Sequence, residues 1–346
     1  MAAMIDRPDY INAITPFIDK PLVKILAGIR RCGKSTIIEM LKPELLKRGV
    51  YEGNIIQKKY TEMDIPESTS AKEMYDELLN AIAGKGRCYL LLDEIQEIKD
   101  WEKAVNSLLE GADVDIYVTG SNSKLMSSEI STYLTGRYVS IPVYTLSFRE
   151  YLDSKADRMR SQKELLEEYI RFGGFPIIAL TDYEEQPAYQ IVNGIYHTVV
   201  SRDIVKRHRI NKQDLFNRVV RYIIENMGKT FSANSITKFL KSKHRTVSVE
   251  SIYNYLRWLE QAFIIYPCQR YDLQGKSILK TQEKYYLADV SLKYGLLGYN
   301  RKMLDGAMEN IVFLELKRRS YDVFIGKNEN KKIDFIASRE TAEKSV

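Results

Sequence analysis

The chain has 346 residues, more than one domain of about 100–200 residues would need. Its 45% hydrophobic and 28% charged residues are typical of a folded globular protein and exclude a wholly disordered one. Lys and Arg number 52 against 46 Asp and Glu, a small excess that permits an acidic partner without requiring one. No uncharged apolar run approaches the roughly 18 residues that span a bilayer, and the N-terminus lacks the apolar core of a signal peptide. The three cysteines are too scattered for a disulfide framework or a zinc site. We therefore expect a cytoplasmic protein without membrane contact.

The first 150 residues alternate short apolar runs with helical patterns. Five runs are predicted strands: Leu22–Ala27, Ile55–Tyr60, Tyr89–Leu92, Ile116–Thr119 and Val139–Val143. Apolar residues at helical spacing predict helices over Lys34–Leu46 and Ala71–Ala83. Strands separated by helices need crossover connections, so residues 1–150 are expected to form an α/β domain, a parallel sheet with helices on both faces.

After residue 150 the predicted strands disappear for a long stretch. Four segments have helical patterns: Phe148–Ala156, Gln162–Arg171, Tyr183–Val200 and Asp214–Met227. This change of pattern predicts a domain boundary near residue 150 and a helical region over residues 151–228.

A glycine-rich loop lies between the first predicted strand and the first predicted helix. It matches G-x-x-x-x-G-K-[ST] in full: Gly28, Ile29, Arg30, Arg31, Cys32, Gly33, Lys34, Ser35 and Thr36. Glycines let backbone N–H groups turn inward around phosphates, and the helix N-terminus adds its positive end. Lys34 is expected to reach the β- and γ-phosphates, and the Ser35 hydroxyl to bind Mg²⁺. The loop therefore predicts that ATP and Mg²⁺ are the cofactors.

Two carboxylates, Asp93 and Glu94, end the predicted strand Tyr89–Leu92. Acids at a strand end are often only solvated, but these follow the glycine-rich loop with one strand and one helix between. In P-loop enzymes the first carboxylate lies beside Mg²⁺ and the second beside the attacking water. Asp93 is therefore the candidate metal ligand and Glu94 the candidate general base. The sequence has no NKxD guanine motif in the appropriate place, which argues against a GTPase.

Polar residues also follow the next predicted strand. Ser121 and Asn122 are both candidates to face the attacking water or the γ-phosphate, and the sequence does not choose between them. The alternative is that Ser121 or Ser123 caps a helix.

Arg137 follows a glycine further on. Such a residue is usually part of a solvated turn, but in a dimerising or ring-forming ATPase it can stabilise the transition state in cis or in trans. Arg137 is thus a candidate arginine finger or sensor, and the trans role implies a homo-oligomer.

Seven segments follow one another in an order that resembles a known family. They are Gly28–Thr36, Leu91–Glu94, Thr119–Ser123, Leu134–Tyr138, Tyr144–Glu150, Phe172–Pro176 and Ser201–Ile204. Together they resemble the bacterial and archaeal AAA-type ATPases that carry a C-terminal domain of unknown function, number 4143. The L-S-F-x-E, G-G-F-P and R-D-I segments are specific to that group. Cys32 stands where the family more often has a small or β-branched residue. The resemblance implies an ATPase core followed by a helical region, a winged-helix-like segment and an α/β module similar to restriction-type nucleases.

Residues 229–290 have helix-turn-helix character. Two helical patterns, Ser232–Leu240 and Val247–Leu259, are joined by a basic turn, and Tyr271–Lys284 is a candidate hairpin wing with Gly275 as its turn. Five cations can neutralise phosphates: Lys238, Lys241, Lys243, Arg245 and Arg257. DNA is therefore one candidate partner; the alternative is a winged helix that contacts protein and has a solvated basic face.

Residues 291–346 predict one helix and two strands: Ala307–Arg319, Asp322–Ile325 and Lys332–Ala337. Glu309, Glu315 and Asp334 resemble part of a restriction-type magnesium site, although ordinary helix-surface acids are an equal alternative. Only Glu343-Lys344 appears where the E-x-K strand of such nucleases would follow. We therefore expect a truncated nuclease-like tail that does not cut DNA and persists by packing on the winged-helix-like segment.

Three functions are compatible with these patterns. The first is a Mg²⁺-dependent ATPase whose nucleotide state moves the C-terminal segments. The second is a nucleotide-gated DNA- or protein-binding switch with negligible turnover. The third is an ATP-coupled nuclease, which needs the rest of the tail. Glu94 favours the first, because a switch that only binds nucleotide needs no general base.

Overall fold

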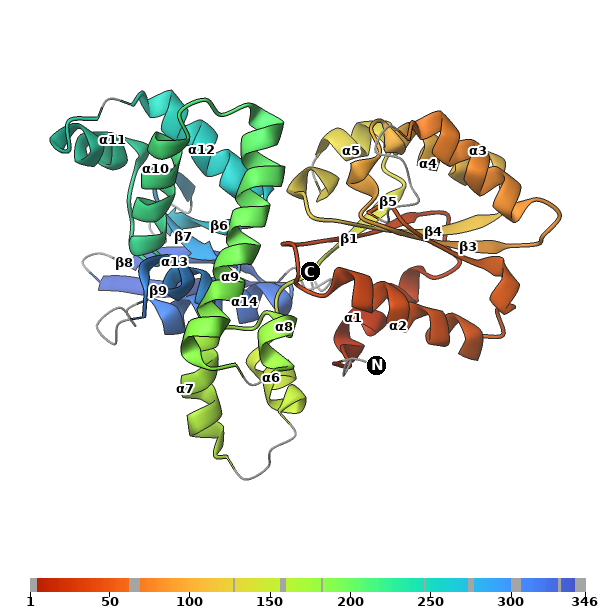
Figure 1. Cartoon of the computed structure of the whole chain (residues 1–346), viewed down its shortest axis with the longest axis horizontal. Coiled ribbons are helices and arrows are strands. Elements are labelled where there is room, and N and C mark those ends of the chain that lie inside the picture. Colours follow the sequence, from red (N-terminus) through yellow and green to blue (C-terminus); the bar gives the residue numbers. More distant parts are fainter. Residues whose placement is uncertain are drawn as a thin grey trace, which may run out of the picture. The chain divides into compact units, whose positions relative to one another are not determined.

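A computed structural model describes residues 5–61, 69–126, 128–155, 160–181, 183–245, 247–272, 277–299, 306–328 and 331–339. The chain divides into two compact units, residues 1–143 and residues 144–346 (Figure 1). Across the described helices, none is long and apolar enough to cross a membrane.

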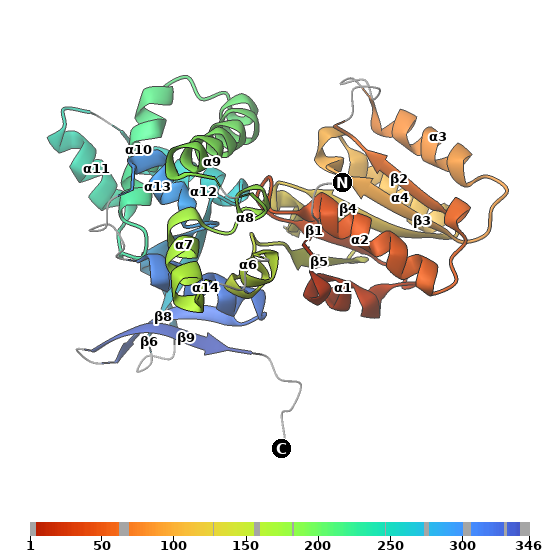
Figure 2. The same cartoon turned by 60° about the horizontal axis from the view of Figure 1, so that its bottom comes forward.

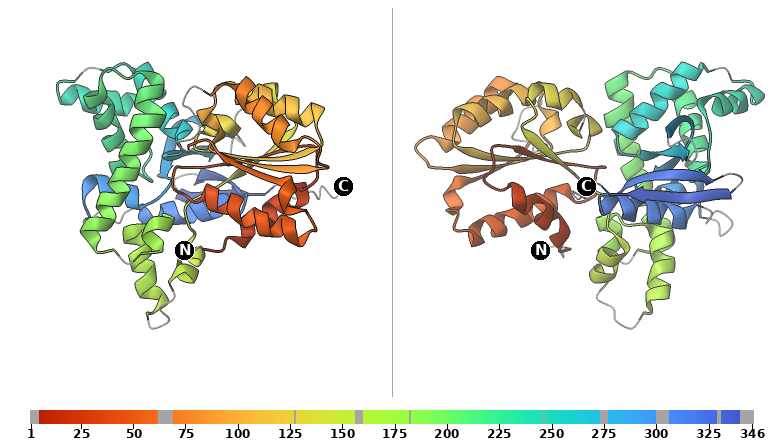
Figure 3. Two further views of the ribbon diagram at one scale, coloured as in Figure 1. Left: turned by 45° about the vertical axis from the view of Figure 1, so that its right-hand side comes forward. Right: turned by 180° about the vertical axis from the view of Figure 1, so that it is seen from behind.

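The first unit is a parallel sheet covered by helices on both faces. Its strands, in the order β2-β3-β4-β1-β5, are β1 (Val23–Ala27), β2 (Ile55–Lys59), β3 (Cys88–Asp93), β4 (Val114–Gly120) and β5 (Tyr138–Pro142). Helices α1 (Pro8–Ile14) and α2 (Lys34–Lys47) lie on one face, and α3 (Ala71–Ile82), α4 (Trp101–Gly111) and α5 (Ser128–Tyr133) on the other (Figure 3). Short 3₁₀ turns complete the unit: η1 (Thr15–Phe17), η2 (Glu52–Asn54), η3 (Ile95–Glu97) and η4 (Ser123–Met126).

Burial explains why these strands could be predicted. Every residue of β1, β3 and β4 is buried, because helices on both faces require apolar runs instead of alternating patterns. All five predicted strands are confirmed. The predicted helices over Lys34–Leu46 and Ala71–Ala83 are confirmed as α2 and α3, while α1, α4 and α5 are helices that were not predicted.

The strand order brings the polar strand ends together. β4 pairs in parallel with β1 on one side and with β3 on the other. The carboxyl ends of these three neighbouring strands therefore meet at one edge of the sheet, which is where ligands bind in open α/β sheets.

The second unit combines helices with a mixed sheet. Its helices are α6 (Phe148–Ser154), α7 (Gln162–Phe172), α8 (Pro176–Ala179), α9 (Glu185–Val199), the π-helix η5 (Val200–Lys206), α10 (Gln213–Glu225), α11 (Ala233–Ser242), α12 (Val249–Gln261), α13 (Ser291–Leu297) and α14 (Ala307–Arg318). Its strands, in the order β7-β6-β8-β9, are β6 (Ile265–Asp272), β7 (Ser277–Leu287), β8 (Asp322–Asn328) and β9 (Lys331–Ser338). The predicted helices of residues 148–227 and the predicted helix and strands of residues 307–337 are confirmed.

The hairpin is longer than the predicted wing and belongs to a larger sheet. β6 and β7 pair from Ile265 and Leu287 to Asp272 and Ser277, and β8 adds to β6 in parallel. The predicted turn at Gly275 lies outside the described residues. Because β6 and β8 share one sheet, the predicted domain boundary at residue 290 separates strands that are hydrogen-bonded to each other. The boundaries at 150 and 228 stay predictions.

Helix α14 lies against this sheet (Figure 2), and one apolar cluster holds it there. Phe313 of α14 is buried and stacks on Tyr286 of β7, with ring centroids 4.3 Å apart. Phe335 of β9 packs against the same cluster. The tail thus packs on the hairpin of the preceding segment, as predicted.

Candidate active site

The glycine-rich loop joins β1 to α2 at the carboxyl edge of the first sheet. A Cβ at Gly28 would lie 2.0 Å from the carbonyl oxygen of Val143, so no side chain fits there. Gly33 has φ 102° and Arg31 φ 67°, and the left-handed region is inexpensive only for glycine. The two glycines of the motif are therefore required for different reasons, close backbone approach at Gly28 and chain reversal at Gly33.

Lys34 points back into this loop. Its Nζ donates to the carbonyl oxygens of Gly28 and Ile29, at 3.1 Å each, and lies 3.6 Å from Oε1 of Glu94. The side chain is almost fully buried, and a buried ammonium needs such partners. The loop thus holds a buried positive charge between its own carbonyl oxygens and Glu94.

Asp93 ends β3 as a buried carboxylate. Oγ1 of Thr119, on β4, donates to Oδ1 of Asp93 at 2.5 Å and accepts the backbone N–H of Glu94 at 2.9 Å. The sequence pattern does not predict a role for Thr119. The sequence signal that could have indicated this role is a polar residue near the end of an apolar strand, the strand that follows the one ending in Asp93.

Glu94 is the most highly connected residue of the site. Its φ is 54°, a strained conformation that is concentrated at functional sites. Oε2 accepts from Nε2 of Gln96 at 2.5 Å and from Oγ of Ser121 at 3.3 Å, and lies 3.8 Å from Nη1 of Arg30. Burial acts to raise the pKa of Glu94, but the charges of Lys34 and Arg30 and the hydrogen bonds from Gln96 and Ser121 outweigh it. The pKa is therefore held below its usual range, and Glu94 is a carboxylate at neutral pH.

Arg30 was predicted only as a residue of the glycine-rich loop and Gln96 was not predicted, yet both contact Glu94. Nη2 of Arg30 lies 3.2 Å from Oε1 of Glu97, and its side chain is 12% exposed. Arg30 therefore links the glycine-rich loop to two acids that follow β3. Arg30 stands at a variable position of the glycine-rich motif, and Gln96 lies outside the motifs. Only the folded chain therefore shows that both contact Glu94.

The two residues that the sequence left open both follow β4 directly. Ser121 and Asn122 are both buried, but the hydroxyl that touches Glu94 is that of Ser121. Ser121 is therefore the residue that stands between the end of β4 and the carboxylate.

Arg137 is not part of this site. Its carbonyl oxygen accepts the N–H of Val23, at the start of β1, and its guanidinium contacts Asn106 at 2.9 Å and Glu110 at 2.5 Å. Because β5 runs parallel to β1, Arg137 lies about 16 Å of strand away from the glycine-rich loop. The cis role predicted for Arg137 is therefore wrong, and only the trans role stays a prediction.

The magnesium set predicted for the tail is not assembled either. Glu309 binds Lys284 and the hydroxyl of Tyr286, and Glu315 pairs with Arg318 and Arg319. Within the described parts of the chain, no group of three or more His, Cys, Asp and Glu is placed to hold a metal ion. Glu343-Lys344 lies outside the described residues.

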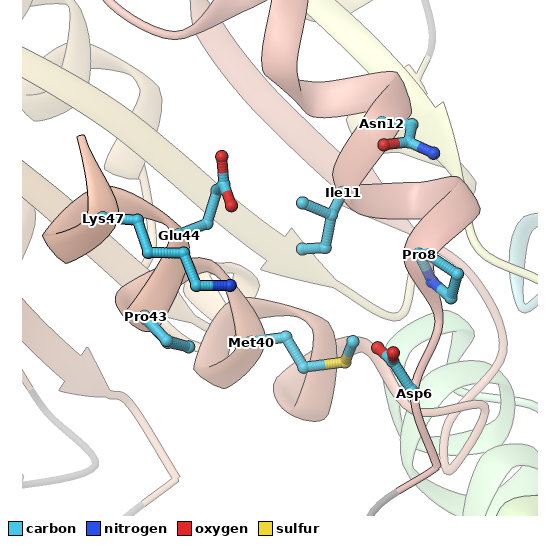
Figure 4. Close-up of a pocket in the computed structure, with 8 residues that line it drawn as sticks. All are labelled: Asp6, Pro8, Ile11, Asn12, Met40, Pro43, Glu44 and Lys47. Atoms are coloured by element: carbon cyan, nitrogen blue, oxygen red, sulfur yellow. The ribbon is translucent and has the colours of Figure 1, made fainter.

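A separate pocket of about 390 Å³ lies between α1 and α2 (Figure 4). It is lined by Asp6, Pro8, Ile11, Asn12, Met40, Pro43, Glu44 and Lys47. The neighbouring Arg7 is buried and donates to the carbonyl oxygen of Cys32 at 2.9 Å. The segment before α1 therefore supports the glycine-rich loop, while the pocket itself contains no residue of that loop.

Comparisons with known proteins agree with this geometry. The AAA domain family matches residues 20–152, and a domain of unknown function (DUF8612) matches residues 163–302, where domain 4143 was expected. A Walker-type ATPase of Pyrococcus abyssi, Paby2304, has the same fold with a TM-score of 0.58 at 14% identity, over 84% of this chain and 95% of that chain. Residues 20–152 therefore belong to the AAA domain family, and the likeness to the Walker-type ATPase is one of fold.

Two curated relatives extend over nearly the whole chain. An uncharacterized protein of Haemophilus influenzae is 34% identical over 340 residues, which cover 97% of this chain and 84% of that protein. Protein MJ1544 of Methanocaldococcus jannaschii, also named as uncharacterized, is 30% identical over 337 residues, which cover 93% of this chain and 73% of that protein.

Proposed function

We propose that the protein binds ATP with Mg²⁺ and hydrolyses it at the carboxyl edge of the first sheet. The observation that carries this proposal is the position of Glu94. Its carboxylate is mostly buried, lies 3.6 Å from Lys34 and accepts hydrogen bonds from Gln96 and Ser121. A carboxylate kept ionised beside the phosphate loop is suited to take a proton from water.

The metal ligands fit a Mg²⁺ ion. Asp93 is a buried carboxylate whose one hydrogen-bond partner among the described residues is the neutral hydroxyl of Thr119, so a cation there would compensate its charge. Ser35 follows Lys34 at the start of α2 and supplies a hydroxyl oxygen. Hard oxygen donors of this kind are what Mg²⁺ prefers, and when bound it would neutralise charge on the β- and γ-phosphates.

The remaining groups have distinct roles in the proposed reaction. Backbone N–H groups of Gly28–Thr36 hold the phosphates, and Lys34 exchanges its carbonyl partners for phosphate oxygens. Glu94 takes a proton as the water oxygen bonds to the γ-phosphorus, the bond from that phosphorus to the bridging oxygen breaks, and ADP leaves. Ser121, rather than Asn122, orients the water beside Glu94.

We propose further that nucleotide state is transmitted to the second unit through residues 143–147. The N–H of Val143 donates to the carbonyl oxygen of Ala27, directly before the loop, at 2.7 Å. Three residues on, Leu146 N–H donates to the carbonyl oxygen of Gly174 at 2.7 Å. Asp289 holds that turn, because it accepts the N–H of Gly174 at 2.8 Å. Within three residues the chain thus passes from Val143, held by the end of β1 in the first unit, to Leu146, held within the second unit.

DNA is the partner we propose for the second unit. Helices α11 and α12 and the β6–β7 hairpin follow one another as in a winged helix. Lys238, Lys241, Lys243 and Arg245 are exposed, which supports the phosphate contacts predicted for these four residues.

The experiment that tests the ATPase is phosphate release by the whole chain at saturating ATP. The wild type is expected to release phosphate in Mg²⁺ and to stop in EDTA, and Lys34→Ala to stay at the background rate. Equal rates for the wild type and Lys34→Ala would refute the proposal.

One observation favours a second candidate, a nucleotide-gated switch with negligible turnover. Arg30 and Lys34 both stabilise the carboxylate of Glu94, which weakens it as a base. A wild type that binds ATP tightly, releases no phosphate above background and changes its DNA affinity with nucleotide would support the switch instead.

A further inference from the structure

Most of the excess positive charge of this protein comes from two segments at one end of the second unit. Residues 206–214 and 241–250 contain seven Lys and Arg against two Asp and Glu, a net charge of +5 out of +6 for the whole chain. Six of these cations are defined here as the basic end: Lys206, Arg207, Arg209, Lys212, Lys243 and Arg245. All six are exposed.

The two segments are brought together by the fold. Nη2 of Arg245, in the turn after α11, lies 3.9 Å from Oδ2 of Asp214, in the first turn of α10. Lys212 is the residue directly before α10. The segment between η5 and α10 therefore lies at the same end of the unit as the turn after α11 (Figure 1).

Residues 206–212, the first of the two basic segments, are anchored to the helices beneath them. The ring of His208 stacks on that of Trp258 of α12, with centroids 4.3 Å apart and planes 13° from parallel. Ile210 is buried, and its N–H donates to the carbonyl oxygen of Val205 at 3.2 Å. Because the backbone is already held in place, binding a partner does not have to order it.

The exposed face of α12 differs from the basic end. This is the helix that a winged helix would place in the major groove. Its exposed residues are Glu250, Tyr253 and Arg257, one acid and one cation, and the guanidinium of Arg257 donates to Asn254. The face therefore adds no net charge, and its arginine is already engaged.

We propose that the basic end binds the phosphate backbone of duplex DNA without regard to base sequence. The inference rests on DNA being the partner of the second unit, and it specifies which residues make the contact. A duplex carries one negative charge per about 1.7 Å of its axis, so cations from two neighbouring turns engage several phosphates at once. Phosphate contacts fix the protein on the duplex without reading sequence.

The test is fluorescence anisotropy with the full chain and two 30-base-pair duplexes of unrelated sequence, between 50 and 200 mM KCl. The wild type is expected to bind both duplexes alike. Replacing Lys206, Arg207 and Arg209 together with Gln removes three phosphate contacts. Since each contributes about 0.9 to the slope of log K against log salt, the slope should become shallower by about 2.7.

Three further variants make the result decisive. The pair Lys243→Gln and Arg245→Gln, on the other turn, should flatten the slope by about 1.8. Arg257→Gln should leave both affinities within about twofold. A control with the same charge change in the first unit, Lys72, Lys99 and Lys103 to Gln, should bind like the wild type.

Other outcomes overturn the proposal. Unchanged affinity in both basic-end variants would do so, as would strong preference for one duplex that is lost in Arg257→Gln. Binding to an acidic protein but to neither duplex would assign the surface to a protein partner. Phosphate release without DNA is measured on the same samples: unchanged release in the variants shows that they fold, and a wild type that binds both duplexes but releases no phosphate would refute the ATPase while leaving the basic end intact.

Discussion

Replacing Glu94 with Gln separates catalysis from binding at the proposed site. The amide is nearly the same size, and its oxygen can still accept from Gln96 and Ser121. What disappears is the negative charge near Lys34, at 3.6 Å, and Arg30, at 3.8 Å. The variant therefore keeps the shape of the site and loses the group that accepts the proton.

The expected magnitude follows from these contacts. Loss of a positioned general base lowers kcat by about 10²–10⁴-fold, which corresponds to about 2.7–5.4 kcal/mol of barrier. Nucleotide affinity should stay the same or increase, because Lys34 no longer has a carboxylate competing with phosphate oxygens.

Two measurements check this prediction: kcat from steady-state phosphate release and Kd from the fluorescence of a labelled ADP. Glu97→Gln is the matched control, because Glu97 also contacts Arg30, at 3.2 Å, and kcat there should change by less than about fivefold. A Glu94→Gln variant with kcat within fivefold of the wild type would refute the base role. A hundredfold weaker Kd would show instead that Glu94 builds the site.

Three more predictions concern the surroundings of the site. Arg30→Ala removes a charge that lowers the pKa of Glu94; because only the carboxylate accepts a proton, the acid limb of kcat/KM against pH should move to higher pH, and an unmoved limb would contradict the contact. Lys24→Met leaves the buried carboxylate of Asp115 without its cation and should lower the free energy of unfolding in urea by about 3–5 kcal/mol; a loss below 1 kcal/mol would show that Asp115 does not need it. If Arg137 acts in trans, specific activity should rise with protein concentration in the wild type and stay low in Arg137→Ala, whereas activity independent of concentration would leave Arg137 a structural partner of α4.

The parts of the fold that could be predicted are those whose pattern is local. The strands of the first sheet are unbroken apolar runs because helices cover both faces, and the glycine-rich loop is a continuous motif. α4 was not predicted although Trp101, Ala104, Val105 and Leu108 are buried at helical spacing. That pattern is local and is present in the sequence.

The parts that could not be predicted depend on contacts between distant residues. Arg30 reaches Glu94 only because β1 and β3 both flank β4. Arg137 is the opposite case. It is close in sequence to other motif residues, but the sequence does not reveal at which edge of the parallel sheet it lies. The parallel pairing of β6 with β8 likewise joins strands about 50 residues apart, which no local pattern specifies.

The most direct test of the proposed chemistry is a crystal structure of the whole chain with ADP, Mg²⁺ and tetrafluoroaluminate, which mimics the transferring phosphoryl group. We expect Nζ of Lys34 to leave the carbonyl oxygens of Gly28 and Ile29 and bind the mimic. We expect Asp93 to lie beside the metal, and the carboxylate of Glu94 to bind the apical water. A complex in which the mimic is bound while Glu94 stays with Arg30, with no water within hydrogen-bond distance, would contradict Glu94 as the base.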